Sequence, residues 1–304
     1  MSIYTIGTIL KEIRIEKGIS QTDMCRGLCS KPMVSYIENE MRIPHRKLIE
    51  SLFSRLGETL DLSKVPMTKA DLQRANLEFR INACVAIENN EIKDMLDEYV
   101  SCKKSMTHLE KQFVECYETF YINRRFDSHA IILPKLVGAL KLTIKDYSLE
   151  KFPSQKLLSR MEIIILNNIA RCFFSLGKQK EALEILTKLK KYYENALVSE
   201  EEKAVMYPLL LFNITNYERM LGKTDNMRRF SKAGLNLCLN FNKLLMMPYF
   251  LFYTEYASLI EDDTYSNDKI QLAKKIIEKF NRDDDVEFIQ NLIDNYKISK
   301  EKDK

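Results

Sequence analysis

Apolar residues recur at intervals of three and four along most of this chain, which is the spacing of one face of an α-helix. The first such stretch contains Ile6, Leu10 and Ile13, and Gly18 follows it as a helix-ending glycine does. From residue 70 onward, similar stretches follow one another, separated by short polar turns and without strand-like alternation. The pattern predicts an all-α protein.

Two short helices are expected directly after this first stretch. Ser20 is placed to cap one of them, in which Met24 and Leu28 face inward. Ser30 is placed to cap the next, and Pro32 costs nothing in its first turn because the missing N–H has no helical partner there. Two short helices joined by a tight turn are the arrangement of a helix-turn-helix.

The second helix of that pair has an inward and an outward face. Val34 and Ile37 lie one turn apart and point inward, which leaves a polar face exposed. Pro44 opens another helix, which closes the core and ends at Gly57. We expect a domain of five short helices spanning residues 1–66.

A helix with such an exposed face can enter the major groove of DNA. Its polar side chains supply donors for phosphates and base edges. We place Gln21 beside the DNA backbone, Ser30 at the cap of the helix, and Lys31, Met33 and Ser35 against the bases. The candidate phosphate contacts are Tyr36, Arg42, His45, Arg46 and Lys47. The alternative is that this helix is a solvated face of a protein-binding bundle.

The spacing of these residues resembles the Cro/C1-type helix-turn-helix domain. The matching positions are Ser20-Gln21, Met24-Cys25, Val34-Ser35, Ile37-Glu38 and Pro44. The chain departs from that pattern in a turn that is one residue shorter and in Glu40, where the family often has glycine. The resemblance implies that Arg14 and Glu38 form a structural ion pair between the first and third helices.

Residues 67–296 contain one clear internal repeat. Six residues recur 45 positions later, so that Leu166, Asn168, Ile169, Leu176, Gly177 and Lys178 match Leu211, Asn213, Ile214, Leu221, Gly222 and Lys223. A shared offset of this kind predicts a repeated helical hairpin. The run from Gly177 to Leu186 resembles the second helix of tetratricopeptide repeats, although their usual period is shorter, about 34 residues. That resemblance implies a right-handed superhelix of about five degenerate hairpins, and we expect a disordered charged tail at 297–304.

In such a superhelix the first helices of the hairpins line a concave face. If Gly177 and Gly222 mark turns within hairpins, Asn168 and Asn213 lie at equivalent points of that face. A side-chain amide can bond both the C=O and the N–H of an extended peptide. The candidate peptide-binding residues are Asn168, Arg171, Asn213, Asn216 and Arg219. Helix capping or interhelical bonding is the alternative role of the two asparagines.

Composition narrows the function classes without selecting one. The 304 residues are 45% hydrophobic and 30% charged, and the net charge of +4 is weak support for nucleic-acid binding. The seven cysteines and three histidines form no zinc pattern, which indicates free thiols in a reducing compartment. Without a signal-peptide pattern or an apolar run of about 20 residues, a cytoplasmic protein is expected. No catalytic constellation indicates an enzyme, and no cofactor is expected.

A Cro/C1-type domain followed by degenerate tetratricopeptide-like repeats resembles the peptide-pheromone-responsive regulators of Gram-positive bacteria, the RRNPP group of the PlcR, PrgX and Rgg types. Residues 6–14 and the short turn before Ser30-Lys31 look like that branch. The resemblance implies a quorum-sensing transcription regulator that binds palindromic operator DNA as a homodimer and is controlled by a short imported peptide. Two alternatives remain open: a phage- or plasmid-type repressor whose repeats bind a protein or small molecule, and a helical adaptor without DNA binding.

Overall fold

The computed structural model describes residues 5–59, 69–87, 91–102, 105–126, 129–153, 157–194, 197–262 and 265–302. Within these ranges the regular structure is helical, apart from one isolated bridge between Ser148 and Lys151. The chain divides into two compact units, Met1–Glu202 and Lys203–Lys304, and each is described by itself. The predicted all-α fold is confirmed.

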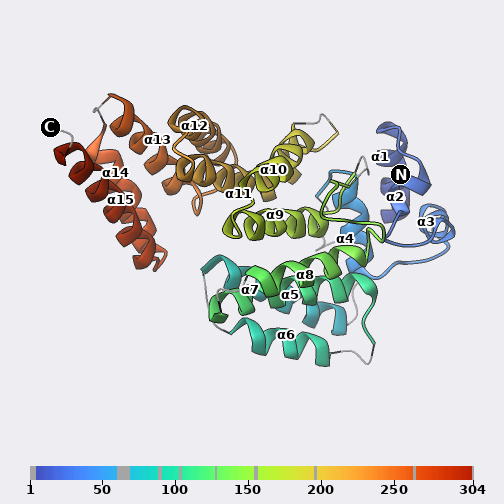
Figure 1. The fold of residues 1–304 in the computed structure, drawn as a ribbon. Helices are drawn as coiled ribbons and strands as arrows, with labels where there is room; N and C mark the ends of the chain where they lie inside the picture. The colour runs from blue at the N-terminus through green and yellow to red at the C-terminus, as the bar shows by residue number, and fades with distance from the viewer. Residues whose placement is uncertain are drawn as a thin grey trace. The chain divides into compact units, whose positions relative to one another are not determined.

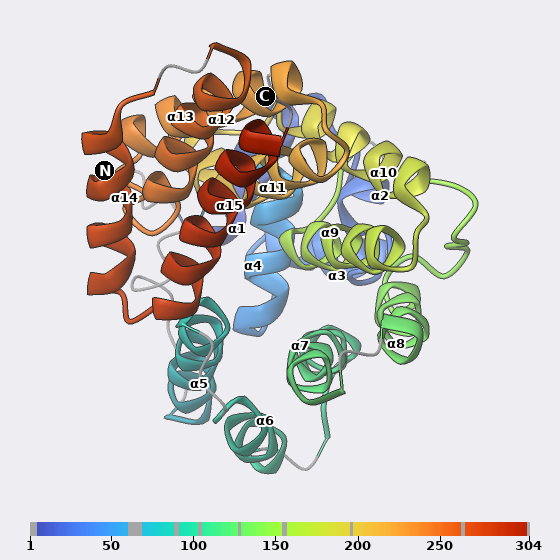
Figure 2. The ribbon, with the colours of Figure 1, turned by 60° about the vertical axis from the view of Figure 1, so that its left-hand side comes forward.

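Four short helices begin the first unit, as Figures 1 and 2 show: α1 (Ile6–Glu16), α2 (Gln21–Cys25), α3 (Lys31–Glu38) and α4 (Arg46–Arg55). Each begins at a side chain that accepts a hydrogen bond from the first turn, namely Thr5, Ser20, Ser30 and His45. Residues 5–59 hold four of the five helices expected within residues 1–66, and the rest of that range lies outside the described residues. The predicted domain boundary after residue 66 lies outside the described residues.

These four helices enclose the core that the apolar spacing indicates. The core side chains, each at most 3% exposed, include Leu10, Met24, Leu28, Val34, Ile37, Leu48, Leu52 and Leu56. Leu109 and Leu157, from much later in the chain, belong to the same apolar cluster. The helix-turn-helix therefore shares its core with the helices that follow it.

The rest of the first unit is a series of helical hairpins. Their helices are α5 (Lys69–Ile87), α6 (Ile92–Ser101), α7 (His108–Phe126), α8 (His129–Lys141), α9 (Arg160–Ser175) and α10 (Gln179–Tyr193). Each helix packs against the next one in sequence, and α7 also contacts α9 (Figures 1 and 2). In the last hairpin, the small residues Ala170 and Ala182 are fully buried and Gly177 turns the chain at φ +78°. Packing between successive neighbours is the pattern of a repeat protein.

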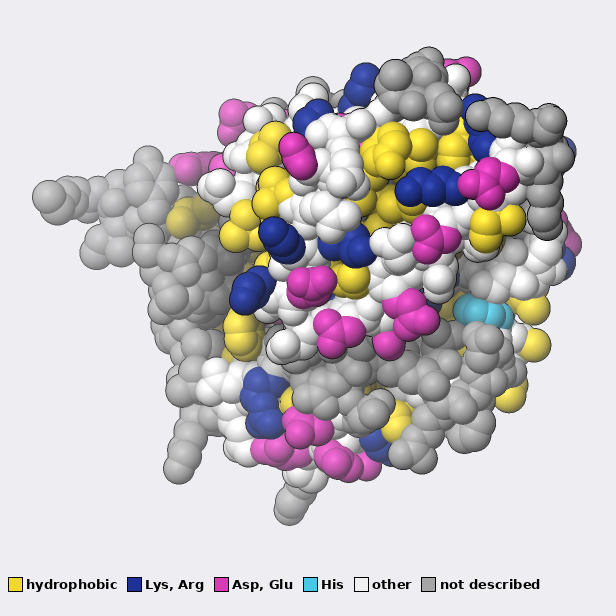
Figure 3. Space-filling view, turned by 90° about the vertical axis from the view of Figure 1, so that its left-hand side faces the viewer, with side chains coloured by type: hydrophobic (Ala, Val, Ile, Leu, Met, Phe, Trp, Pro, Cys, Tyr) yellow, Lys and Arg dark blue, Asp and Glu magenta, His cyan; other side chains and the backbone are white. Residues whose placement is uncertain are grey.

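The second unit continues the series of helices. It holds most of α11 (Glu200–Met220), with α12 (Thr224–Asn240), α13 (Met247–Asp262), α14 (Asn267–Lys279) and α15 (Asp283–Lys302). Helices α12 to α15 pack in sequence order around an apolar core that includes Phe252 and Ala257. Figure 3 shows the face seen from the side of α14 and α15, where acidic and basic side chains are interspersed with apolar ones.

Helix α15 corrects one expectation from the sequence. It continues to Lys302, so residues 297–302 are helical and do not form a disordered tail. Ile289 and Ile293 are buried, and the Tyr296 hydroxyl donates to the carbonyl oxygen of Ile260 at 3.2 Å. Because these contacts fix the helix, the charged residues that follow only extend a helix that is already nucleated.

Gly27→Ala should destabilise the protein much more than Gly18→Ala. Both glycines have left-handed φ values, +75° and +64°, at a cost of about 1–2 kcal/mol for any other L residue. A Cβ atom on Gly27 would lie 1.8 Å from the carbonyl oxygen of Thr143, whereas one on Gly18 would meet nothing within 4 Å. We expect overpacking to add about 1–3 kcal/mol for Gly27→Ala. Urea unfolding measures both losses, and equal losses would contradict the close approach of the turn to residue 143.

Candidate DNA-binding surface and ligand-binding positions

Helix α3 carries the exposed face that the sequence predicts, with one difference. Its inward residues Val34 and Ile37 are buried, and Lys31 and Tyr36 are exposed. Met33, expected to face DNA bases, is only partly exposed and packs against the domain core. The exposed face of α3 is therefore narrower and more polar than expected.

The polar groups at the ends of α3 are held locally. Ser30 caps the helix, and its hydroxyl oxygen accepts a hydrogen bond from the backbone N–H of Met33 at 3.3 Å. Ser35 is partly buried, and its hydroxyl oxygen accepts from the Asn39 amide at 3.4 Å. Lys31 thus offers a charged group on this face without an ion pair to any described residue.

The ion pair between Arg14 and Glu38 is present and nearly buried. The guanidinium donates two hydrogen bonds to the carboxylate, Nε to Oε1 at 2.6 Å and Nη2 to Oε2 at 2.9 Å, and the Glu38 side chain is 2% exposed. Gln21, predicted beside the DNA backbone, donates from Nε2 to Glu38 Oε2 at 2.8 Å. Burial alone raises the pKa of Glu38, but the bonds from Arg14 and Gln21 outweigh it and lower that pKa. Gln21 therefore has a structural role in locking α2 to α3.

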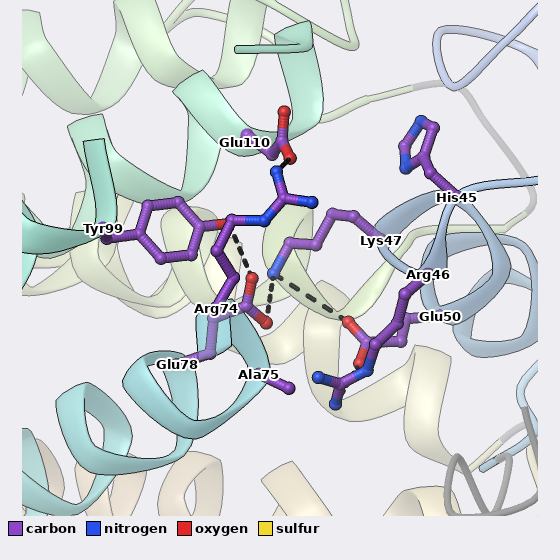
Figure 4. A pocket seen from close by; sticks show the side chains of 9 residues that line it. All are labelled: His45, Arg46, Lys47, Glu50, Arg74, Ala75, Glu78, Tyr99 and Glu110. Carbon is purple, nitrogen blue, oxygen red and sulfur yellow. Dashed lines mark hydrogen bonds and ion pairs between the residues drawn. The ribbon is translucent and has the colours of Figure 1, made fainter. Parts of the chain in front are cut away.

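The cations proposed as phosphate contacts separate into two groups. Arg42 and His45 are exposed, and His45 Nδ1 caps α4 by accepting from the backbone N–H of Leu48 at 3.2 Å. Arg46 and Lys47 point the other way, into the interface between α4 and α5 to α7 (Figure 4). The helical period thus turns Lys47 toward the repeats, and its role as a phosphate contact stays a prediction.

Lys47 and Arg46 belong to a polar network between α4 and the first repeats. Lys47 Nζ lies 3.1 Å from Glu78 Oε2, 4.0 Å from Glu50 Oε2 and 4.3 Å from the centre of the Phe113 ring. Arg46 pairs with Glu50 at 2.8 Å. Burial raises the pKa of Glu50, and the charge of Lys47 opposes that rise. Through Lys47, the network ties the first turn of α4 to α5 and α7.

Two further contacts complete the small pocket around this network (Figure 4). The Tyr99 hydroxyl donates to Glu78 Oε1 at 2.7 Å, and Arg74 pairs with Glu110. The pocket has a volume of about 280 Å³, and positive and negative side chains alternate around it. Because these charges already pair with one another, the pocket is a joint within the first unit and offers no strong site for a charged ligand.

The most deeply buried ion pair of the described residues joins the C-terminal end of α4 to α9. Arg55 Nη2 donates to both carboxylate oxygens of Glu162 at 2.7 and 2.9 Å, and both side chains are fully buried. Arg55 Nη1 also donates to the carbonyl oxygen of Arg26. Glu162 in turn accepts from the backbone N–H of Ser159 at 2.7 Å, in the capping box of α9.

Backbone contacts strengthen the same joint. The backbone N–H of Ser199 donates to the carbonyl oxygen of Gly57 at 2.7 Å, and His108 Nε2 lies 2.9 Å from the carbonyl oxygen of Gly27. Lys17 Nζ donates to the carbonyl oxygens of Leu56 and Leu197 at 2.7 and 2.6 Å. The helix-turn-helix is therefore docked on the repeats of the first unit through Lys17 after α1, through the turn after α2, and through α4 with the residues that follow it.

This joint was not predicted from the sequence, although one residue carries a usable signal. Arg55 occurs among apolar positions of α4, between Leu52 and Leu56. A charged residue on the apolar face of a helix needs a buried partner. Its partner, Glu162, is 107 residues away, and sequence spacing cannot identify a partner at that distance.

The candidate peptide-binding residues make local bonds in each unit. In the first unit, the Asn168 amide donates to the carbonyl oxygen of Ile164 at 2.8 Å, and its oxygen accepts from Arg171 Nη1 at 3.2 Å. In the second unit, Asn216 Oδ1 accepts from Arg219 and from the Tyr253 hydroxyl, each at 3.0 to 3.2 Å. Asn213 is 8% exposed, like Asn168. These bonds of Asn168 and Asn216 are thus mostly local, and the peptide-binding role stays a prediction.

The described residues contain no group of three or more His, Cys, Asp or Glu side chains placed to hold a metal ion. None of their helices is both long and apolar enough to cross a lipid bilayer.

Comparison with known proteins agrees with this description. A helix-turn-helix family model matches residues 10–62. Bacillus thuringiensis PlcR, solved with the peptide PapR7 and DNA, has a similar fold at 14% sequence identity and a TM-score of 0.56, over 96% of this chain and 98% of PlcR. The apo form of ComR from S. thermophilus is similar at 11% identity and a TM-score of 0.42, over 98% of this chain and 99% of ComR. A search of curated protein sequences gave no match.

These findings confirm the helix-turn-helix and, at the level of the fold, the predicted resemblance to regulators of the PlcR type. The likeness extends over nearly the whole of both chains, so it includes the repeats as well as the N-terminal helices. At this level of identity it shows a shared fold.

Glu38→Ala should lower the stability of the first unit by about 3–5 kcal/mol, because it leaves the nearly buried Arg14 without its partner. The stabilising effect of the pair should be present at neutral pH and be lost as the pH falls through the lowered pKa of Glu38. Urea unfolding at neutral and at acidic pH measures both effects. Glu184→Ala, which removes an exposed helical ion pair, is the control and should change little. A Glu38→Ala variant as stable as this control would show that the pair is not structural.

Proposed function

We propose that this protein is a cytoplasmic transcription regulator that binds operator DNA through α3 and is controlled by a short signalling peptide bound to its helical repeats. The observation that carries the proposal is a helix-turn-helix with an exposed α3, continuous with repeats that share the PlcR fold over nearly the whole chain. The solved PlcR structure contains both a peptide and DNA. Both ligands are therefore proposed for this chain, with no enzymatic activity.

The docking of the helix-turn-helix supports its use on DNA. The contacts to the repeats involve the α2–α3 turn at Gly27 and the inner side of α4. Lys31 and Tyr36 on α3, with Arg42 and His45 after it, are exposed on the described surface. Lys31, Tyr36 and Arg42 thus take no part in these docking contacts, whereas His45 also borders the pocket between α4 and the repeats.

Binding as a homodimer follows from the size of the recognition element. One α3 helix of eight residues buries too little surface for tight specific binding. Two copies related by a two-fold axis would read half-sites about 34 Å apart, or a multiple of that spacing. We therefore propose a palindromic operator.

The peptide is proposed to bind through Asn168 and Asn213, with Arg171, Asn216 and Arg219 beside them. Asn168 has one amide N–H beyond the one that it donates to Ile164. The helices that carry Asn168 and Asn213 each end, as predicted, at a glycine with a left-handed φ, Gly177 and Gly222. In the sequence repeat, each of these amides comes nine residues before its glycine, and an extended peptide backbone offers C=O and N–H groups that such amides can bond.

Lys31→Ala with Ser35→Ala should weaken specific DNA binding by roughly thirtyfold or more, since two good base contacts at about 1–3 kcal/mol each sum to at least about 2 kcal/mol. The measurement is fluorescence anisotropy with an operator fragment selected from random DNA by the unmodified protein. The matched control is Lys93→Ala with Ser101→Ala, which removes the same two side chains from the exposed surface of α6. Equal affinities for the two double variants would remove α3 from the DNA interface.

Asn168→Ala with Asn213→Ala should weaken peptide binding by one order of magnitude or more, at about 0.5–1.5 kcal/mol for each hydrogen bond lost. Calorimetric titration with a peptide selected by the unmodified protein from a synthetic heptapeptide pool measures this. The control is Asn76→Ala with Asn240→Ala, two exposed asparagines on α5 and α12. DNA binding without peptide should be the same in all three proteins. If the first double variant binds peptide as tightly as the control does, these asparagines have only a structural role, in helix capping or interhelical bonding.

A further inference from the structure

A second small pocket lies within the first unit, between α7, α8 and α9. Its wall contains Thr119, Phe120, His129, Ile132, Asn168 and Arg171, and its volume is about 230 Å³. Part of this space is open to solvent, so a group of a larger ligand would reach it from the surface.

Arg171 gives the pocket its charge. Its one hydrogen bond to a described residue runs from Nη1 to Asn168 Oδ1 at 3.2 Å, and no carboxylate of the described residues pairs with it. A guanidinium is always protonated and presents five N–H donors in a planar fork. Most of the donors of Arg171 are thus not used by the described residues.

The neighbouring polar groups do not neutralise this charge. The Thr119 hydroxyl donates to the carbonyl oxygen of Cys116 at 2.6 Å, and the Asn168 amide donates to its own helix. On the adjacent surface of α7, Glu118 lies 3.5 Å from Lys135 of α8, so this carboxylate has a cation of its own. The Asn168 oxygen instead orients the guanidinium of Arg171. The pocket combines a fixed cation with the apolar walls of Phe120 and Ile132.

We propose that this pocket binds a carboxylate of the signalling peptide, held by Arg171, while Asn168 holds Arg171 in position. A carboxylate matches the guanidinium fork because its two oxygens accept two parallel N–H bonds. The group is supplied either by the C-terminus of the peptide or by an Asp or Glu side chain. This inference rests on the proposed peptide-binding function and adds to it the chemical group that the first unit recognises.

Four synthetic heptapeptide pools test the proposal on the full-length protein. Two pools have free C-termini and two have amidated C-termini, and one of each kind lacks Asp and Glu. Affinity selection with mass spectrometry measures how strongly each pool is retained. The unmodified protein should retain carboxylate-bearing peptides roughly tenfold to a hundredfold better than the amidated pool without acidic residues, as expected for hydrogen bonds to a charged group. The two intermediate pools distinguish a terminal from a side-chain carboxylate.

Arg171→Met should abolish this preference and retain uncharged peptides, whereas Arg171→Lys should keep part of it. Lys141→Met, which removes an exposed cation from the last turn of α8 outside the pocket, should leave the preference unchanged. A preference that survives in Arg171→Met, or that is absent in the unmodified protein while peptides are still retained, would overturn the carboxylate site and leave the proposed function standing. If the unmodified protein retains no peptide from any pool, the proposed function fails and the carboxylate site with it.

Discussion

The first unit depends on a charge pair placed where charges are costly. Arg55 and Glu162 are both fully buried, between the end of α4 and the start of α9. A buried pair adds little net stability compared with apolar residues, but either partner alone would be strongly destabilising. Any shifted docking of α4 on α9 would bury one charge without the other. The main effect of the pair is therefore to fix the position of the helix-turn-helix on the repeats, because only one arrangement keeps both charges paired.

The other contacts at this joint depend on the same arrangement. Lys47 reaches Glu78 only when the first turn of α4 faces α5, and Gly27 reaches Thr143 only when the α2–α3 turn lies against the end of α8. Two ion pairs and one close backbone approach, at three separate points, hold this small domain as a part of the first unit. Under the proposed function, a peptide bound to α9 would thus act on a body that already includes α3.

Much of the fold could be predicted from the sequence because it is local. Helical spacing, the caps Ser20 and Ser30 and the turns at Gly18 and Gly177 each depend on residues a few positions apart. The Arg14–Glu38 pair was expected from the family resemblance. The docking surface could not be predicted, because Arg55 and Glu162 are 107 residues apart and spacing gives no register between distant helices. For the same reason, Lys47 was expected at DNA and its contact with Glu78 was not predicted. The tail after residue 296 was expected to be disordered because the anchoring of α15 by Tyr296 depends on the distant Ile260.

Native-state hydrogen exchange of the full-length protein tests most directly whether the helix-turn-helix and the repeats of the first unit form one body. The buried amides of α4, such as Leu52 and Phe53, should open with the same free energy as those of α9, such as Ile165 and Leu166. Glu162→Gln should lower both by the same amount, whereas Glu184→Gln on α10 should change neither. If the α4 amides open at a much lower free energy than those of α9 and do not respond to Glu162→Gln, the helix-turn-helix is an independent domain.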